Sequence, residues 1–361
     1  MTKTVCNILL LLAVPLFGAC TEVAYCVQCA VGHFDVQSKT RPIADLLNDP
    51  AVPTAEKQKL ERVVQIRDFA VAELDLPDND SYRLYADIGR PYVVWNVVAT
   101  PEFSLAPKQW CYPVVGCVAY RGYFSEEKAR LMAKELAEQG YDVDVYGVKA
   151  YSTLKWFNDP VLNTFLDGDD SQLAGLIFHE LAHQVAYTKD DCSFNEAFAR
   201  TVETEGLRRW LEKSSTKEEW TAYLERQRIG DQFLVTLQQT REQLSELYNR
   251  SPPDEEKRSG KQRILADLTD QLREQRHLWP NPAALDNWLA RGLNNARLAG
   301  IATYHEQVPA FQGLLTAVDN SLPAFYTEVR RLARLPAAER TTQLAEHGTL
   351  IEVACVDPEP E

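Results

Sequence analysis

Residues Leu173 to Tyr187 form a strongly apolar stretch whose spacing predicts a helix. Its polar side chains are His179, Glu180, His183 and Gln184. A helix this apolar is buried on folding, and buried polar groups need partners. Positions i and i+4 lie one above the other on a helix, so His179 and His183 share one face. The stretch therefore predicts either two hydrogen-bonded histidines in a core or two imidazoles directed at one ion.

A short segment after this helix offers a third ligand. The chain has six histidines, so an HExxH pattern alone arises by chance on the order of once in a hundred such sequences and needs support. Catalytic zinc uses three protein ligands and keeps one position open. Ser193 predicts the N-cap of a second helix, from which Glu196 can reach the histidine face. Glu203 is expected to accept a hydrogen bond from a ligand histidine; a solvated glutamate near the similarly placed Glu205 is the alternative.

Glu180 is offset around the helix from the two histidines. It is therefore a poor metal ligand but lies within reach of a metal-activated water as its proton acceptor. The pattern predicts peptide hydrolysis with Zn²⁺ as cofactor, His179, His183 and Glu196 as ligands, and Glu180 as general base. Tyr304 and His305, in a later apolar segment, are the candidate donors to the oxyanion, with a core tyrosine as the alternative.

The remaining patterns predict an α+β fold. A mixed sheet with helices is expected over residues 20–166, a mainly helical metallopeptidase part over 167–340, and a tail over 341–361. In the first part, helical spacing covers 55–74 and 125–139, and β-branched or alternating residues predict strands at 92–101, 114–124 and 141–146.

Two charged helical stretches, 217–249 and 254–276, are separated by Ser251-Pro252-Pro253. Leucines recur at helical spacing on both, which predicts an antiparallel helical hairpin over 217–276. Its charges are read as solvated faces, with a partner-binding arm as the alternative.

The first residues are typical of an export signal. Lys3 precedes the apolar run Ile8 to Phe17, which is too short to span a bilayer and is expected to be a signal peptide over 1–19. Phe17-Gly18-Ala19-Cys20 resembles the bacterial lipobox, in which the cysteine carries lipid. We expect an exported, periplasmic lipoprotein anchored to the membrane through Cys20; a plain secreted enzyme is the alternative.

Cysteines and charge narrow the function further. Apart from Cys6 and Cys20, six cysteines remain, and Cys111 and Cys117 could close a small loop. Cys26 and Cys29 form a CxxC, but no thioredoxin-like context surrounds them. The net charge of −14 argues against nucleic-acid binding, which relies on clustered Lys and Arg.

The HExxH helix, together with Glu196 and Glu203, resembles the gluzincin metallopeptidases, although the spacing from His183 to Glu196 is shorter than in most of that group. More specifically, the chain resembles the bacterial "putative aminopeptidase" family of predicted lipoproteins over almost its whole mature length. The stretches that carry this resemblance are Ile66–Ala70, Arg90–Val97, Gly116–Phe124, Ala150–Leu154 and Phe178–Gln184.

The resemblance implies an aminopeptidase acting on peptide or protein substrates. The Gly-x-Met-Glu-Asn motif that binds the substrate amine in alanyl-type enzymes is absent, and Glu102 is a candidate for that role. A zinc endopeptidase and a non-catalytic periplasmic lipoprotein scaffold are the alternatives.

Overall fold

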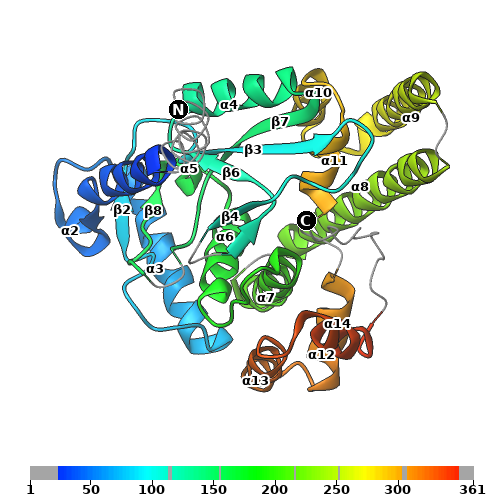
Figure 1. Cartoon of the computed structure of the whole chain (residues 1–361). Helices are drawn as coiled ribbons and strands as arrows, with labels where there is room; N and C mark the ends of the chain where they lie inside the picture. Colours follow the sequence, from blue (N-terminus) through cyan, green and yellow to red (C-terminus); the bar gives the residue numbers. More distant parts are fainter. Residues whose placement is uncertain are drawn as a thin grey trace, which may run out of the picture.

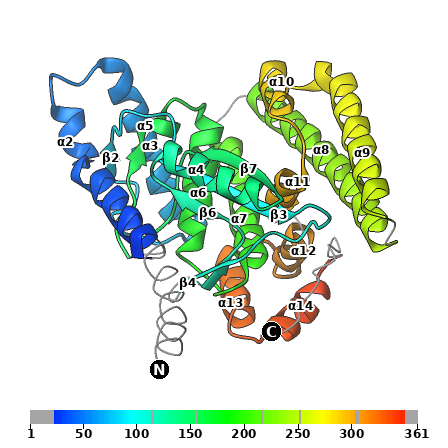
Figure 2. The same cartoon turned by 45° about the horizontal axis from the view of Figure 1, so that its top comes forward.

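The computed structural model describes residues 23–112, 116–153, 156–214, 217–250, 253–302 and 307–348 (Figures 1 and 2). The fold is α+β, as the sequence predicts. All the described strands lie in the N-terminal half, and helices make up the described C-terminal half.

Three small sheets contain the strands. Their orders are β1-β2-β8, β6-β3-β7 and β4-β5. The strand bounds are β1 Arg41–Pro42, β2 Leu84–Ala86, β3 Val94–Pro101, β4 Trp110–Tyr112, β5 Gly116–Val118, β6 Arg121–Tyr123, β7 Tyr141–Val148 and β8 Val161–Leu162.

The helices begin with an N-terminal helix over residues 23–38. The others are α2 Ile43–Asn48, α3 Thr54–Leu74, α4 Glu126–Glu138, α5 Asn163–Leu166, α6 Asp170–His183, α7 Cys192–Ser214, α8 Lys217–Asn249, α9 Asp254–Glu274, α10 Pro282–Ala290, α11 Asn295–Ala302, α12 Val308–Ala317, α13 Leu322–Leu332 and α14 Ala337–Ala345, with a 3-10 turn at Gln275–Leu278.

Strand β3 is the centre of the largest sheet, and it pairs antiparallel with both β6 and β7. Because side chains alternate along a strand, Trp95, Val97 and Ala99 share one face. They form a buried cluster with α4, which covers that face (Figure 1). Val94 and Asn96 point to the other face and line a cavity there. The alternation of β3 thus separates a packed layer from a functional one.

The main core lies where α3, α6 and α7 meet the C-terminal helices α12 to α14. Phe198 of α7 contacts Phe311 of α12 and Phe325 of α13, with ring centroids 6.1 and 5.8 Å apart. The Tyr326 hydroxyl donates to the carbonyl of Leu74 at the end of α3. These contacts fix α6 and α7 between elements from both ends of the chain.

Helices α8 and α9 form the predicted hairpin and run beside each other at one side of the molecule (Figures 1 and 2). Its interior is a separate leucine cluster with members on both helices and on α10 and α11. The hairpin is tied to the sheet by Lys261, whose Nζ lies 2.6 Å from the Asp142 carboxylate of β7. It therefore packs on the fold rather than projecting freely.

Candidate metal centre

Helices α6 and α7 approach closely because glycines lie at their contact. A Cβ on Gly175 would lie 3.0 Å from Leu207 Cδ1, and one on Gly206 would lie 2.7 Å from Phe178 Cδ2. Larger residues would push the two helices apart. The close approach brings the inward faces of α6 and α7 within reach of one another.

Helix α6 ends at His183, which corrects the prediction of a helix to Tyr187. Gln184, the next residue, is buried, and its side chain forms hydrogen bonds with residues outside the helix. Its amide donates to Ser81 Oγ at 3.1 Å, and its carbonyl oxygen accepts from Asn79 at 2.7 Å. These bonds to a loop far away in sequence end the helix directly after the second histidine.

The start of α7 also differs from the prediction. The helix begins at Cys192, and the side chain of Asp191, rather than that of Ser193, accepts a hydrogen bond from the Phe194 amide at 3.0 Å. Asn195 forms two hydrogen bonds with the backbone of Thr188, at 2.8 and 2.7 Å. The turn between the two helices is thus held from both sides, immediately before Glu196.

His179, His183 and Glu196 each offer one donor atom, and these three atoms lie within 4.8 Å of one another. Nε2 of His179 lies 3.3 Å from Glu196 Oε2, and Nε2 of His183 lies 3.6 Å from Glu196 Oε1. Two donors bound at about 2.1 Å to one tetrahedral ion lie roughly 3.4 Å apart. The spacing and the donor chemistry fit a divalent metal.

Glu203 orients one of these histidines. Its Oε2 lies 3.2 Å from Nδ1 of His179, and the Arg200 guanidinium forms an ion pair with its other oxygen. Because of these contacts, Glu203 is not the solvated glutamate of the alternative interpretation. Glu205 forms ion pairs with Arg208 and Arg209 instead. Nδ1 of His183 is buried and has no such partner among the described residues.

The two imidazoles differ in basicity. Burial lowers the pKa of His179, but hydrogen bonds to Glu196 and Glu203 outweigh it and raise that pKa to about 10. Burial lowers the pKa of His183 to about 4, so this ring is neutral, the form that binds metals. Burial acts to raise the pKa of Glu196, but the two histidines hold it below its usual value.

Glu180 lies in the same cavity as the three candidate ligands. Burial raises the pKa of its carboxyl to about 7, and the charge of His179 opposes that rise. The candidate base and the candidate ligands therefore face a common space, as the HExxH pattern predicts.

The predicted oxyanion donors Tyr304 and His305 lie outside the described residues, as does Cys20. The sequence analysis gave no role to the tyrosines that line the cavity, and two of them, Tyr120 and Tyr187, interact with the charge of Glu196. Burial raises the pKa of each, and the charge of Glu196 adds to the shift. The only sequence signal for Tyr120 is that it lies in Gly116–Phe124, one of the stretches that carry the family resemblance. That resemblance assigned no role to Tyr120.

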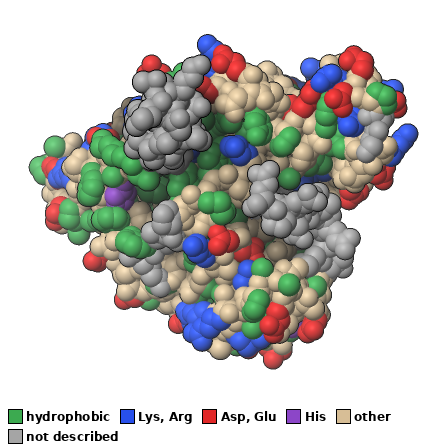
Figure 3. Space-filling view, in the orientation of Figure 1, with side chains coloured by type: hydrophobic (Ala, Val, Ile, Leu, Met, Phe, Trp, Pro, Cys, Tyr) green, Lys and Arg blue, Asp and Glu red, His purple; other side chains and the backbone are tan. Residues whose placement is uncertain are grey.

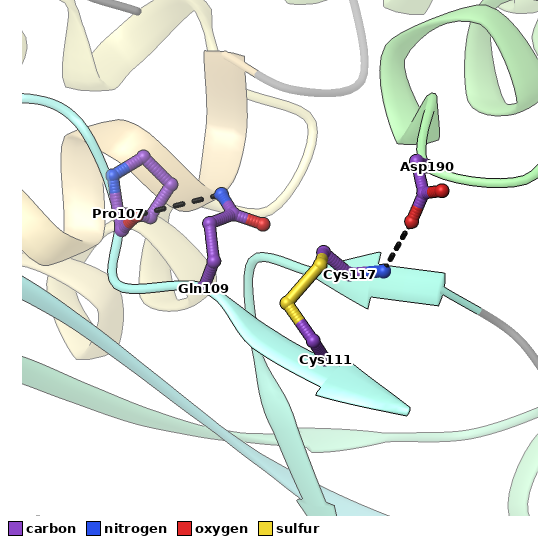
Figure 4. Close-up of a disulfide and its surroundings, with 5 residues drawn as sticks. All are labelled: Pro107, Gln109, Cys111, Cys117 and Asp190. Atoms are coloured by element: carbon purple, nitrogen blue, oxygen red, sulfur yellow. Dashed lines mark hydrogen bonds between the residues drawn. A yellow bond between two sulfur atoms is a disulfide. The ribbon is translucent and has the colours of Figure 1, made fainter. Parts of the chain in front are cut away.

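A disulfide joins Cys111 of β4 to Cys117 of β5, closing the small loop that their spacing allowed (Figure 4). The Cys117 amide donates to the Asp190 carboxylate at 2.6 Å, so this hairpin rests on the turn between α6 and α7. Cys26 and Cys29 are free thiols on the N-terminal helix, and burial raises the pKa of Cys29. A raised thiol pKa disfavours a redox role for this CxxC pair, because the thiolate is the reactive form.

Glu102 is not among the described residues that line the cavity. Both of its carboxylate oxygens accept from Arg258 of α9, at 2.7 and 3.0 Å, which argues against the expectation that it binds a substrate amine. Among the described residues, no helix is long and apolar enough to cross a membrane.

A family model described as "Putative aminopeptidase" matches residues 24–344. The chain belongs to this family. Membership implies a hydrolase of the aminopeptidase type, and the matched region contains both helices of the metal centre. No curated protein and no solved structure matches the chain.

Proposed function

We propose that this chain is a zinc-dependent aminopeptidase with His179, His183 and Glu196 as ligands and Glu180 as general base. The observation that supports it most is the convergence of two imidazoles and one carboxylate from two helices, in a cavity that also contains Glu180. The described residues supply three ligands, the number used by catalytic rather than structural zinc.

A bound Zn²⁺ would supply a Lewis acid that polarises the scissile carbonyl and activates water near neutral pH. The residues of the chain do the rest. Glu180 accepts the proton of the attacking water and returns it to the leaving amine. Glu203 holds the His179 ring, and the phenols of Tyr120 and Tyr187 lie in the cavity as donors for the developing oxyanion.

The decisive experiment measures metal content and peptide turnover on the purified full chain. We expect about one zinc per chain, loss of turnover after chelation, and recovery when zinc is restored. A chain that cleaves peptides equally well after its metal has been removed would contradict the proposal. Comparing peptides with free and acetylated N-termini distinguishes an aminopeptidase from an endopeptidase, because only the first needs the free amine.

Three substitutions assign the roles. Glu180→Gln should retain zinc and lose turnover, because the amide cannot accept the proton. His183→Ala and Glu196→Ala should lose zinc, because each removes a ligand. Turnover by Glu180→Gln, or full zinc in both alanine variants, would reject the corresponding assignment.

A further inference from the structure

The cavity that contains the metal centre extends well beyond it. Its volume is about 730 Å³, a size that suits a small ligand or a few residues of a peptide. Its lining includes His179, His183 and Glu196 of the metal centre. It also includes Tyr25, Cys29 and His33, which follow one another at intervals of four on the N-terminal helix.

The lining of this cavity includes an aromatic wall made of His33, Phe124, Tyr151 and Phe157. Nδ1 of His33 lies 2.8 Å from the Tyr151 hydroxyl, and the His33 and Phe157 rings are 4.4 Å apart. Phe124 meets Tyr151 edge-on, with centroids 5.8 Å apart. On the face of the molecule that Figure 3 shows, hydrophobic side chains gather on the left.

The aromatic wall is held in place before any ligand arrives. The Gln28 side chain bonds the backbone of β6 at Gly122 and that of Phe124, at 3.2 and 3.3 Å. A Cβ on Gly32 would lie 2.1 Å from Phe124 Cγ, so the N-terminal helix packs directly on this ring. A preformed apolar surface binds a ligand without losing much side-chain conformational entropy.

Apart from its histidines, the cavity carries charge of one sign among its described lining residues. Its described lining includes the carboxylates of Glu180, Asp190, Asp191 and Glu196 and contains no lysine or arginine. Asp191 is neutralised from outside by Arg340, at 2.7 Å. Away from the metal centre, a carboxylate on a ligand side chain would find no lysine or arginine in the described lining and would meet like charges, which disfavour it.

We propose that the cavity selects short peptides whose N-terminal residue has a large apolar or aromatic side chain, which packs against the aromatic wall. This inference rests on the proposed function and adds its substrate class. Apolar side chains gain from burial on such a surface in proportion to their area, whereas acidic ones are excluded by the carboxylates.

The first test uses the zinc-loaded full chain and free-amine peptides that differ only in their first residue. We expect kcat/KM for Phe, Trp and Leu to exceed that for Ala by about tenfold or more, with Asp and Glu the poorest. Equal rates for all residues, or a preference for acidic, basic or small ones, would overturn the inference.

A substitution in the aromatic wall can be compared with a matched substitution outside the cavity. The Phe157 side chain is 44% exposed and its backbone is held by Thr153, so Phe157→Ala should fold. We expect it to lower kcat/KM for Phe peptides about tenfold and for Ala peptides much less. The control is Leu131→Ala on α4, which removes a 58% exposed apolar side chain outside the cavity and should change neither. Equal losses on both substrates in Phe157→Ala would count against the aromatic wall.

A binding measurement keeps this test separate from that of the proposed function. Calorimetry with the Glu180→Gln chain compares the dipeptides Phe-Phe and Asp-Asp. Binding of Phe-Phe at least tenfold tighter supports the inference even if no variant or wild-type chain turns over peptides, in which case only the proposed function fails. Equal affinities, or binding of neither dipeptide, would reject it.

Discussion

The Glu203 carboxylate lies 3.2 Å from Nδ1 of His179, on the side of the ring opposite the Nε2 atom that faces Glu196. One imidazole therefore joins two glutamates that lie two turns apart on α7. The arrangement fixes which nitrogen of His179 is free for a metal, since the other is engaged.

Replacing Glu203 with Gln should weaken zinc binding about 10- to 100-fold, because the amide orients His179 less firmly. Competition with a chelator of known affinity measures this. Glu205→Gln is the matched control: it lies on the same helix, its ion-pair partners among the described residues are Arg208 and Arg209, and it should leave zinc affinity unchanged. Identical zinc affinity in both variants would show that Glu203 does not support the ligand.

Removing the Tyr120 hydroxyl tests the oxyanion donor. Tyr120 lies in the cavity near Glu196, so Tyr120→Phe should lower kcat about 10²-fold while zinc content stays the same. Tyr112→Phe, another cavity tyrosine that stacks on Tyr25, is the control and should retain its activity. The sequence predicts Tyr304 or His305 instead. A large loss in Tyr304→Phe, with full activity in Tyr120→Phe, would return the role to Tyr304.

Arg67 holds the loop that ends α6. It is fully buried, and its guanidinium donates to the carbonyls of Ser81, Pro77 and Asn79 at 2.9, 2.6 and 3.0 Å. Arg67→Met leaves these groups unpaired, so we expect the free energy of unfolding to fall by about 3 kcal/mol or more. Arg83→Met, which removes an exposed pair with Asp68, should cost less than about 1 kcal/mol. Denaturant titration compares the two, and similar losses would contradict the prediction.

Asp159 should make stability depend on pH. Its side chain accepts from the Thr153 amide and Ser152, and the residue is 2% exposed. Burial raises its pKa from 3.8 to about 6, against those hydrogen bonds. Between these values the unfolded chain binds fewer protons than the folded one. Stability contributed by the neutral carboxyl is therefore full below about pH 4 and is lost as pH rises through about 6, by up to about 3 kcal/mol.

The Asp159→Asn chain isolates this effect, since the amide does not ionise. Unfolding midpoints measured from pH 4 to 8 should decline in the wild type relative to the variant across the window, and then run parallel. A constant difference over the whole range would mean that Asp159 titrates normally in the folded chain.

The sequence determined the elements that have strong local signals. The period of leucines predicted α8 and α9, Ser125 caps α4 by accepting from the Lys128 amide, and the alternation in β7 predicted a strand. The facing of His179 and His183 also follows from helical geometry alone, since i and i+4 lie on one side. These features depend on neighbours within a few residues, which a sequence displays directly.

Tertiary structure decided the rest of the site. The approach of Glu196 depends on glycine contacts between two helices, and the end of α6 depends on Asn79 and Ser81, about a hundred residues earlier in the chain. The aromatic wall combines the N-terminal helix with segments far along the chain, and Glu102 is taken by Arg258 of a hairpin distant in sequence. Hydrophobic periodicity does not predict such pairings, because they form only when distant elements pack together and exclude water.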